Sequence, residues 1–136
     1  MFSLSIFIQI IAPIYDKRLK EVNFGILEGI NTQFVRELHV ESSDWMDTLE
    51  MDYRPYAGED LHSVITRQAE AINDIVADSQ GDDTILVVGH GCSLYGLVKT
   101  LVPHDARLRF PDNATAIIVD YKEGHYSLNT ILNAVY

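Results

Sequence analysis

Cysteine is nearly absent from the sequence, and this bounds the class of protein. Among 136 residues there is one cysteine, Cys92, so no disulfide can form within the chain. Structural disulfides belong mainly to oxidising compartments, and their absence fits a reducing cytosol. We therefore expect a cytoplasmic protein. No pair of histidine or cysteine residues has the spacing of a metal site, so we expect neither a metal ion nor a cofactor.

Basic residues are also scarce. Lys and Arg number 10 against 20 Asp and Glu, which gives a net charge of -10 and a pI near 4.7. Nucleic acids and anionic membrane surfaces are bound through basic patches, so this balance argues against both as partners. A phosphate ion or a small phosphorylated metabolite needs only a local positive pocket. Such a ligand therefore remains compatible with the composition.

A long hydrophobic run is missing as well. Residues 1–15 are apolar, but a membrane span needs about 20 apolar residues, and Pro13 and Asp16 end this run early. The run lacks the basic start of a secretory signal. We expect it to form a buried strand or helix, and its isoleucines favour a strand at 7–15. With no repeat, low-complexity tract or linker, residues 1–136 are expected to form one domain.

The most informative stretch runs from Thr84 to Leu101. Its first part, Thr84–Val88, is a continuous β-branched run, typical of a strand buried on both faces. A tight turn around His90 and Gly91 follows, and a helical pattern begins near Ser93. Ligands bind at such strand ends, and a helix N-terminus offers free N–H groups to an anion. His90 and Gly91 are therefore candidate phosphate-binding residues.

The remaining elements follow from periodicity and turn residues. Segment 16–29 is expected to be a loop that positions side chains, with Glu21 and Glu28 as its carboxylates. The helix at 61–78 is the clearest, because its apolar residues recur every three to four positions. The other predictions are two short helices within 31–51 with an N-cap at 42–44, loops at 51–60 and 103–112, a turn at 80–83, and strands at 114–121 and 126–132 around a turn at 122–125.

Four segments resemble the histidine phosphatase superfamily, also called phosphoglycerate mutase-like, and they occur in its order. They are DKRLKEVNFGILEG, YAGED followed by Arg67, LVVGHGCSL and PDNATAIIVDY, and the resemblance covers about residues 14–132. It implies a three-layer α/β/α fold with a mixed, mostly parallel sheet. The short span between Gly29 and Gly58 resembles the phosphatase branch rather than the mutases. The implied reaction is phosphomonoester hydrolysis or phosphoryl transfer through a phosphohistidine.

The resemblance also suggests roles for individual residues. Glu21 matches the acid/base that protonates the leaving oxygen and activates water, and His90 matches the second histidine, which clamps the phosphate. Both are candidate catalytic residues, since fixed donors and a positioned proton donor lower the barrier of phosphoryl transfer. Arg18 is either a phosphate contact or a surface charge. Glu59 is expected to cap the following helix or to pair with Arg67.

The sequence departs from the family pattern in one important respect. It contains neither the Arg-His-Gly segment that carries the nucleophile nor an Arg-Ala-x-Gln-Thr segment, and its other histidines lack that context. We therefore expect the N-terminal part of the family fold to be absent and the activity to be impaired. Strands would then lose ladder partners, and three alternatives stay open. Residues 2–11 replace the missing strand, a second chain replaces it, or the chain is a truncated product that folds poorly.

Three interpretations stay open at this point. The chain is an enzyme remnant, a non-catalytic binding or assembly module, or a phosphatase completed by a second chain. Each is compatible with a homo-oligomer, and none identifies the substrate.

Overall fold

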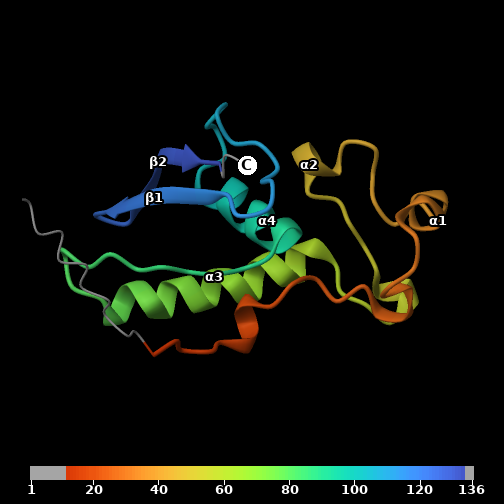
Figure 1. Ribbon diagram of the computed structural model, residues 1–136, viewed down its shortest axis with the longest axis horizontal. Coiled ribbons are helices and arrows are strands. Elements are labelled where there is room, and N and C mark those ends of the chain that lie inside the picture. The colour runs from red at the N-terminus through yellow and green to blue at the C-terminus, as the bar shows by residue number, and fades with distance from the viewer. Residues whose placement is uncertain (1–11, 134–136) are drawn as a thin grey trace, which may run out of the picture.

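The computed structural model describes residues 12–133, which form a mixed α/β structure with four α-helices and one two-stranded sheet in this range (Figure 1). Three short 3-10 turns complete the regular structure. In chain order the elements are η1 (Lys17–Leu19), η2 (Gly25–Leu27), α1 (Thr32–Glu37), α2 (Trp45–Thr48), η3 (Arg54–Tyr56), α3 (Leu61–Asp78), α4 (Gly91–Leu101), β1 (Ala116–Lys122) and β2 (His125–Leu132).

Helix α3 is the longest element and has the bounds that its periodicity predicts. Asp60 is its N-cap, and the Asp60 carboxylate accepts a hydrogen bond from the Ser63 N–H at 2.9 Å. The inward face of α3 packs against α4, where Gly96 lies against Ile65. A Cβ at Gly96 would be 3.1 Å from the Ile65 Cδ1. The small residue therefore lets the two helices approach closely.

The hydrophobic core has two parts that meet at α2. One joins the loops and helices from Val22 to Ile65, and the other joins α4 to the loop at 102–108 and the strands. Trp45 and Leu49 pack against both parts. Asp44 is the N-cap residue of α2, within the predicted segment 42–44, but its side chain makes no cap hydrogen bond. The two short helices predicted between 31 and 51 are confirmed.

Strands β1 and β2 form an antiparallel hairpin, as predicted. Their two-residue connection, Glu123 and Gly124, has φ values of 52° and 85°. Two positive φ values match the right-handed twist of the flanking strands. A register shift between Ile118 and Val119 leaves Asn129 of β2 without a partner in β1, so the bulge lies in β2.

The three-layer fold with a mostly parallel sheet is not seen in residues 12–133, whose sheet contains only β1 and β2. The predicted buried strand at 84–88 is wrong for the described chain. No backbone hydrogen bond joins this segment to another described residue, and Leu86 and Val88 are 86% and 78% exposed. A strand exists only through a ladder partner, and this apolar segment has none among the described residues.

The prediction for residues 1–15 can be examined only from residue 12, because residues 1–11 lie outside the described chain. Segment 12–15 has no regular structure, and Ile14 and Tyr15 are more than nine-tenths exposed. A buried element is therefore wrong for this part. Of the helices within 12–133, none combines the length and apolar character needed to cross a membrane.

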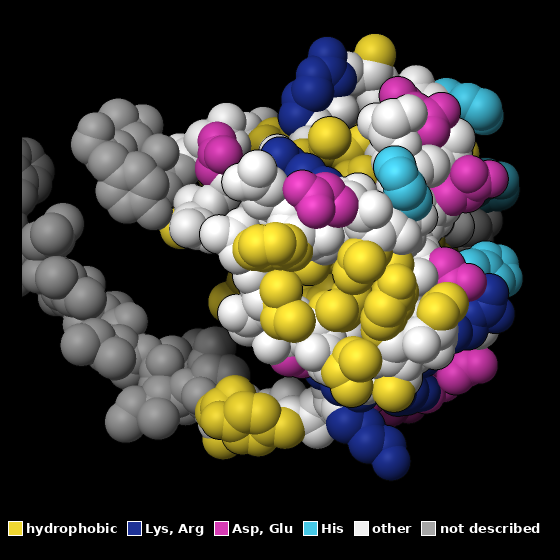
Figure 2. Space-filling model, turned by 90° about the vertical axis from the view of Figure 1, so that its right-hand side faces the viewer, with side chains coloured by type: hydrophobic (Ala, Val, Ile, Leu, Met, Phe, Trp, Pro, Cys, Tyr) yellow, Lys and Arg dark blue, Asp and Glu magenta, His cyan; other side chains and the backbone are white. Residues whose placement is uncertain are grey.

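Apolar side chains also lie exposed around η2 and α1. Ile26 is 71% and Phe34 is 64% exposed. Figure 2 views the molecule from the end where α1 lies, and hydrophobic side chains gather there over one continuous area bordered by acidic, basic and histidine side chains.

Candidate functional site

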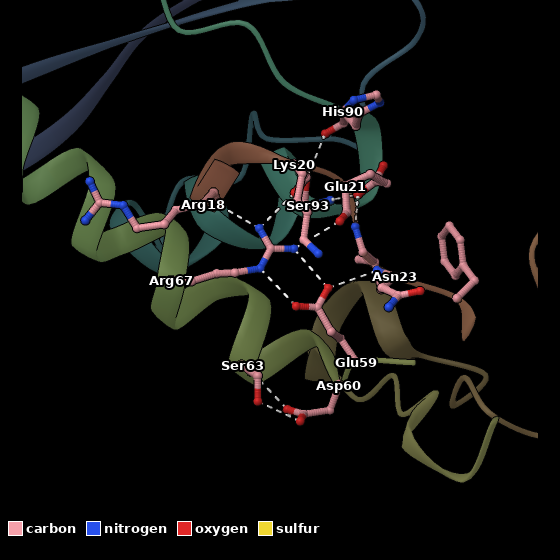
Figure 3. A network of polar contacts seen from close by, with 12 residues as sticks. Arg18, Lys20, Glu21, Asn23, Glu59, Asp60, Ser63, Arg67, His90 and Ser93 are labelled. Carbon is pink, nitrogen blue, oxygen red and sulfur yellow. Dashed lines mark hydrogen bonds and ion pairs between the residues drawn. The ribbon is translucent and has the colours of Figure 1, made fainter. Parts of the chain in front are cut away.

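Glu21 lies where its carboxylate meets the start of α4. Its Oε1 accepts a hydrogen bond from the Ser93 N–H at 2.9 Å, and its Oε2 accepts one from the Cys92 N–H at 3.2 Å (Figure 3). Oε1 also accepts from the Val22 N–H at 2.9 Å. A negative charge at this end of α4 is stabilised by the helix dipole and by N–H groups that have no intrahelical partner. Glu21, 70 residues earlier in the chain, thus acts as a cap for α4.

His90 is the N-cap residue of the same helix. Its carbonyl oxygen accepts from the Leu94 N–H at 2.9 Å, and its side chain is exposed and makes no cap hydrogen bond. Gly91 follows, and a Cβ at that position would lie 3.3 Å from the Phe110 ring. The structure therefore brings three sequence-predicted site residues, Glu21, His90 and Gly91, to one helix end.

Arg18 is not directed toward this helix end. Its guanidinium pairs with Asp16 at 2.6 Å and with Asp74 of α3 at 2.7 Å, and Figure 3 shows it pointing away from His90. The hydrogen bonds from Arg18 lower the pKa of Asp16. In this arrangement Arg18 ties the start of the described chain to α3, and its charge is balanced by two carboxylates.

Arg67 lies at the centre of the polar network beneath the site (Figure 3). Its guanidinium donates two hydrogen bonds to Glu59, at 3.1 and 3.0 Å, so the expected pairing of these residues is confirmed. It also donates to main-chain carbonyls of the loop that carries Glu21. The ion pair was one of two roles expected for Glu59, but nothing in the sequence predicted the contacts of Arg67 with the loop.

Glu59 in turn supports the chain on the other side of Glu21. Its Oε2 accepts from the Asn23 N–H at 3.0 Å, and the Glu59 N–H donates to the Asn23 carbonyl at 2.9 Å. Burial alone would raise the pKa of Glu59, but the hydrogen bonds from Arg67 and Asn23 outweigh it, and the pKa is lowered. Glu59 is therefore held as a carboxylate.

Cys92 is close to the site but is poorly suited to act as a nucleophile. Burial, followed by the charges of Glu21 and Glu41, raises the pKa of its thiol to about 12. The thiolate is the nucleophilic form of cysteine, and it is almost absent at neutral pH with such a pKa. Among residues 12–133, no group of three or more His, Cys, Asp or Glu side chains could hold a metal ion.

A surface groove between α2 and α3 does not coincide with these residues. Its volume is about 600 Å³, and it lies between the end of α2 and the exposed side of α3, with His62 and Thr100 among its lining residues. Neither Glu21 nor His90 lines it. We place the candidate site at the α4 N-terminus because charge and hydrogen-bond donors, rather than hollow space, recognise a phosphoryl group.

The fold and site together define a mixed α/β protein in which one helix end carries an exposed histidine and a capping glutamate. The model of the histidine phosphatase superfamily (branch 1) matches residues 7–134, and the chain belongs to this family. Curated relatives named "Probable phosphoglycerate mutase GpmB", from Escherichia coli O1:K1, O45:K1 (strain S88) and O81 (strain ED1a), are 33% identical over 117 residues, which is 81% of this chain and 52% of theirs. The chain thus spans about half the length of these relatives. No solved structure matches it.

Proposed function

We propose that this chain supplies the acid/base and phosphate-clamping part of a phosphomonoesterase site that acts on a small phosphorylated metabolite. Glu21 would exchange a proton with the leaving oxygen or water, and His90 and Gly91 would hold the phosphoryl oxygens. One observation carries the proposal: the Glu21 carboxylate and His90 occupy the same helix end, with Glu21 2.9 Å from the Ser93 nitrogen. The family membership supports the same reaction class.

The N-terminus of α4 has hydrogen-bond donors that could bind a phosphoryl group. The N–H groups of Cys92 and Ser93 now donate to a carboxylate, which is an anion of similar oxygen geometry to a phosphate face. An incoming phosphoryl group would compete with Glu21 for these donors or bind beside it next to His90. Release of Glu21 toward the leaving oxygen would place an acid within reach of the reacting centre, where such groups contribute roughly 10²–10⁴-fold.

We further propose that residues 1–136 alone do not form a phosphohistidine. No Arg-His-Gly occurs among them, and the guanidinium of Arg18 is already paired with Asp16 and Asp74. Charge spreads over the phosphoryl oxygens in the transition state, so the loss of cationic groups costs catalysis directly. Phosphate binding should therefore survive where turnover does not.

Hydrolysis of p-nitrophenyl phosphate by the purified chain tests both statements. We expect turnover no higher than in a His90→Ala variant, and no acid-labile phosphate on the protein after incubation with the ester. Phosphorus NMR with inorganic phosphate should show binding that the variant weakens. Turnover that disappears in His90→Ala would contradict the proposed impairment. Equal phosphate binding by both proteins would contradict the role of His90.

A second candidate function rests on the apolar segment at 84–88. Because Leu86 and Val88 are exposed, this segment is suited to receive a strand from a second chain, which would make the protein a binding module or one half of a completed phosphatase. Light scattering after size-exclusion chromatography, with and without a polypeptide carrying Arg-His-Gly, tests this. A complex with phosphatase activity would favour completion, a complex without activity would favour a binding module, and a persistent monomer would exclude both.

A further inference from the structure

Arg67 makes more contacts with the Glu21 loop than with its own ion-pair partner. Its Nη1 donates to the Arg18 carbonyl at 2.5 Å and to the Lys20 carbonyl at 2.9 Å, and its Nη2 donates to the Glu21 carbonyl at 3.0 Å. These carbonyls belong to the turn directly before the site. We infer that Arg67, anchored by Glu59, is the positioning residue that holds the Glu21 carboxylate at the N-terminus of α4.

Every N–H of the Arg67 guanidinium donates a hydrogen bond. Five hydrogen bonds leave the guanidinium, three to the loop carbonyls and two to Glu59, one for each N–H that an arginine carries. The Arg67 side chain is 17% exposed, so water competes little for these donors. Because the guanidinium is rigid and all its N–H groups are used, it fixes the main chain of the loop that carries Glu21.

Glu59 closes the arrangement on the far side of Glu21. It binds Arg67 through both carboxylate oxygens and accepts the Asn23 N–H at 3.0 Å. The main chain is therefore held at 18–21 by Arg67 and at 23 by Glu59. With both ends of this short segment fixed, the Glu21 side chain has little freedom other than toward Cys92 and Ser93.

Lysine cannot take this role. Its ammonium is a compact point charge with fewer donors, and it cannot contact three carbonyls and two carboxylate oxygens in one plane. Arg67→Lys therefore keeps the charge and the ion pair with Glu59 but loosens the loop. The variant separates positioning from simple charge balance.

The test is residue-resolved hydrogen exchange by NMR on the full chain, with the amides of Cys92 and Ser93 as reporters. Glu21→Ala sets the upper limit, because it removes their acceptor. We expect Arg67→Lys and Glu59→Gln to speed exchange of these two amides by about five- to tenfold, the range of a helix-cap contact, while the Leu97 and Val98 amides inside α4 keep their rates. Arg54→Lys is the matched control, since the Arg54 side chain is exposed and forms ion pairs with Asp52 and Asp60 instead of with the Glu21 loop.

Each outcome decides the inference. Selective exchange at Cys92 and Ser93 supports it. Unchanged exchange at these amides in both Arg67→Lys and Glu59→Gln overturns it. Uniformly faster exchange throughout α4 also overturns it, because that result means general destabilisation. Glu59→Gln keeps the test decisive if Arg67→Lys does not fold.

The catalytic meaning of this positioning rests on the proposed function, but the exchange measurement needs no substrate. An absence of phosphate binding would refute the proposed function and leave the positioning result unaffected. Unchanged exchange at Cys92 and Ser93 in both Arg67→Lys and Glu59→Gln, with phosphate binding intact, would refute the inference alone.

Discussion

Gly25 lies directly against the main chain of Tyr56: a Cβ at Gly25 would be 1.9 Å from the Tyr56 carbonyl oxygen. Gly25 also has a φ of +62°, in the left-handed region that favours glycine. This contact joins η2 to η3 and keeps the loop after Glu21 close to the loop before α3. The same pair of loops carries Glu59 and Asn23, so the contact supports the candidate site.

Gly25→Ala should therefore destabilise the protein strongly. The left-handed backbone costs a residue with a Cβ about 1–2 kcal/mol, and the clash with Tyr56 adds about 1–3 kcal/mol as for other overpacked sites. Gly29→Ala is the control, because Gly29 has a φ of +74° with nothing within 4 Å of its Cβ position. Urea unfolding should show the smaller loss for Gly29→Ala, and equal losses would show that the contact with Tyr56 relaxes freely.

Acid should weaken the fold in part through Glu59. The pKa of Glu59 is lowered below its ordinary value of 4.5 in the folded chain. A carboxyl with a depressed folded pKa adds stability above its unfolded pKa, and this stability is lost as the pH falls through the folded pKa. Glu59→Gln should therefore be less stable at pH 7 and lose less stability between pH 5 and 3. A parallel pH dependence in both proteins would disprove the assignment to Glu59. Glu70→Gln, at an exposed position of α3, serves as control.

Substitution of Leu86 and of Leu97 should change the free energy of unfolding by very different amounts. Leu86 is 86% exposed, whereas Leu97 is 2% exposed. We expect Leu86→Ser to change the free energy of unfolding by less than about 0.5 kcal/mol, and Leu97→Ala to cost about 2–5 kcal/mol. Thermal and urea unfolding of dilute protein measure both. A large loss for Leu86→Ser would mean that another segment or chain covers it.

The hairpin turn offers a stabilising change. Glu123 adopts a φ of 52° before Gly124, a conformation that asparagine adopts more readily than glutamate in a two-residue turn with Gly second. Glu123→Asn should raise the free energy of unfolding by about 0.5–1 kcal/mol, within the range of favourable backbone substitutions. Gly124→Ala should lower it, since Gly124 has a φ of 85°. A higher melting temperature for Gly124→Ala would refute this view of the turn.

Local signals in the sequence predicted most of the helices and the hairpin. The apolar periodicity and Asp60 determine α3, and the turn residues around Gly124 determine the hairpin. The prediction failed at 84–88, where the apolar pattern could not show whether a partner strand is present. Pairing is a property of two segments, and a continuous apolar run describes only one of them.

The same distinction applies to the site. The turn between an apolar run and a helical pattern indicated His90, and the family resemblance indicated Glu21. The structure places both at the α4 N-terminus. The role of Arg67 was missed because its acceptors are main-chain carbonyls, which leave no residue-type signal. The pairing of Arg18 could be foreseen only in part. Asp16 is close to Arg18 in the sequence, whereas Asp74 of α3 becomes its neighbour only after folding.

The half-buried thiol of Cys92 has a practical consequence. With its pKa raised to about 12, it stays protonated at the pH of ordinary maleimide chemistry. A cysteine engineered on the exposed surface would therefore react ahead of the native one. Fluorophores or spin labels could then be attached at one chosen position without first removing Cys92, and distance measurements on the unaltered site would become straightforward.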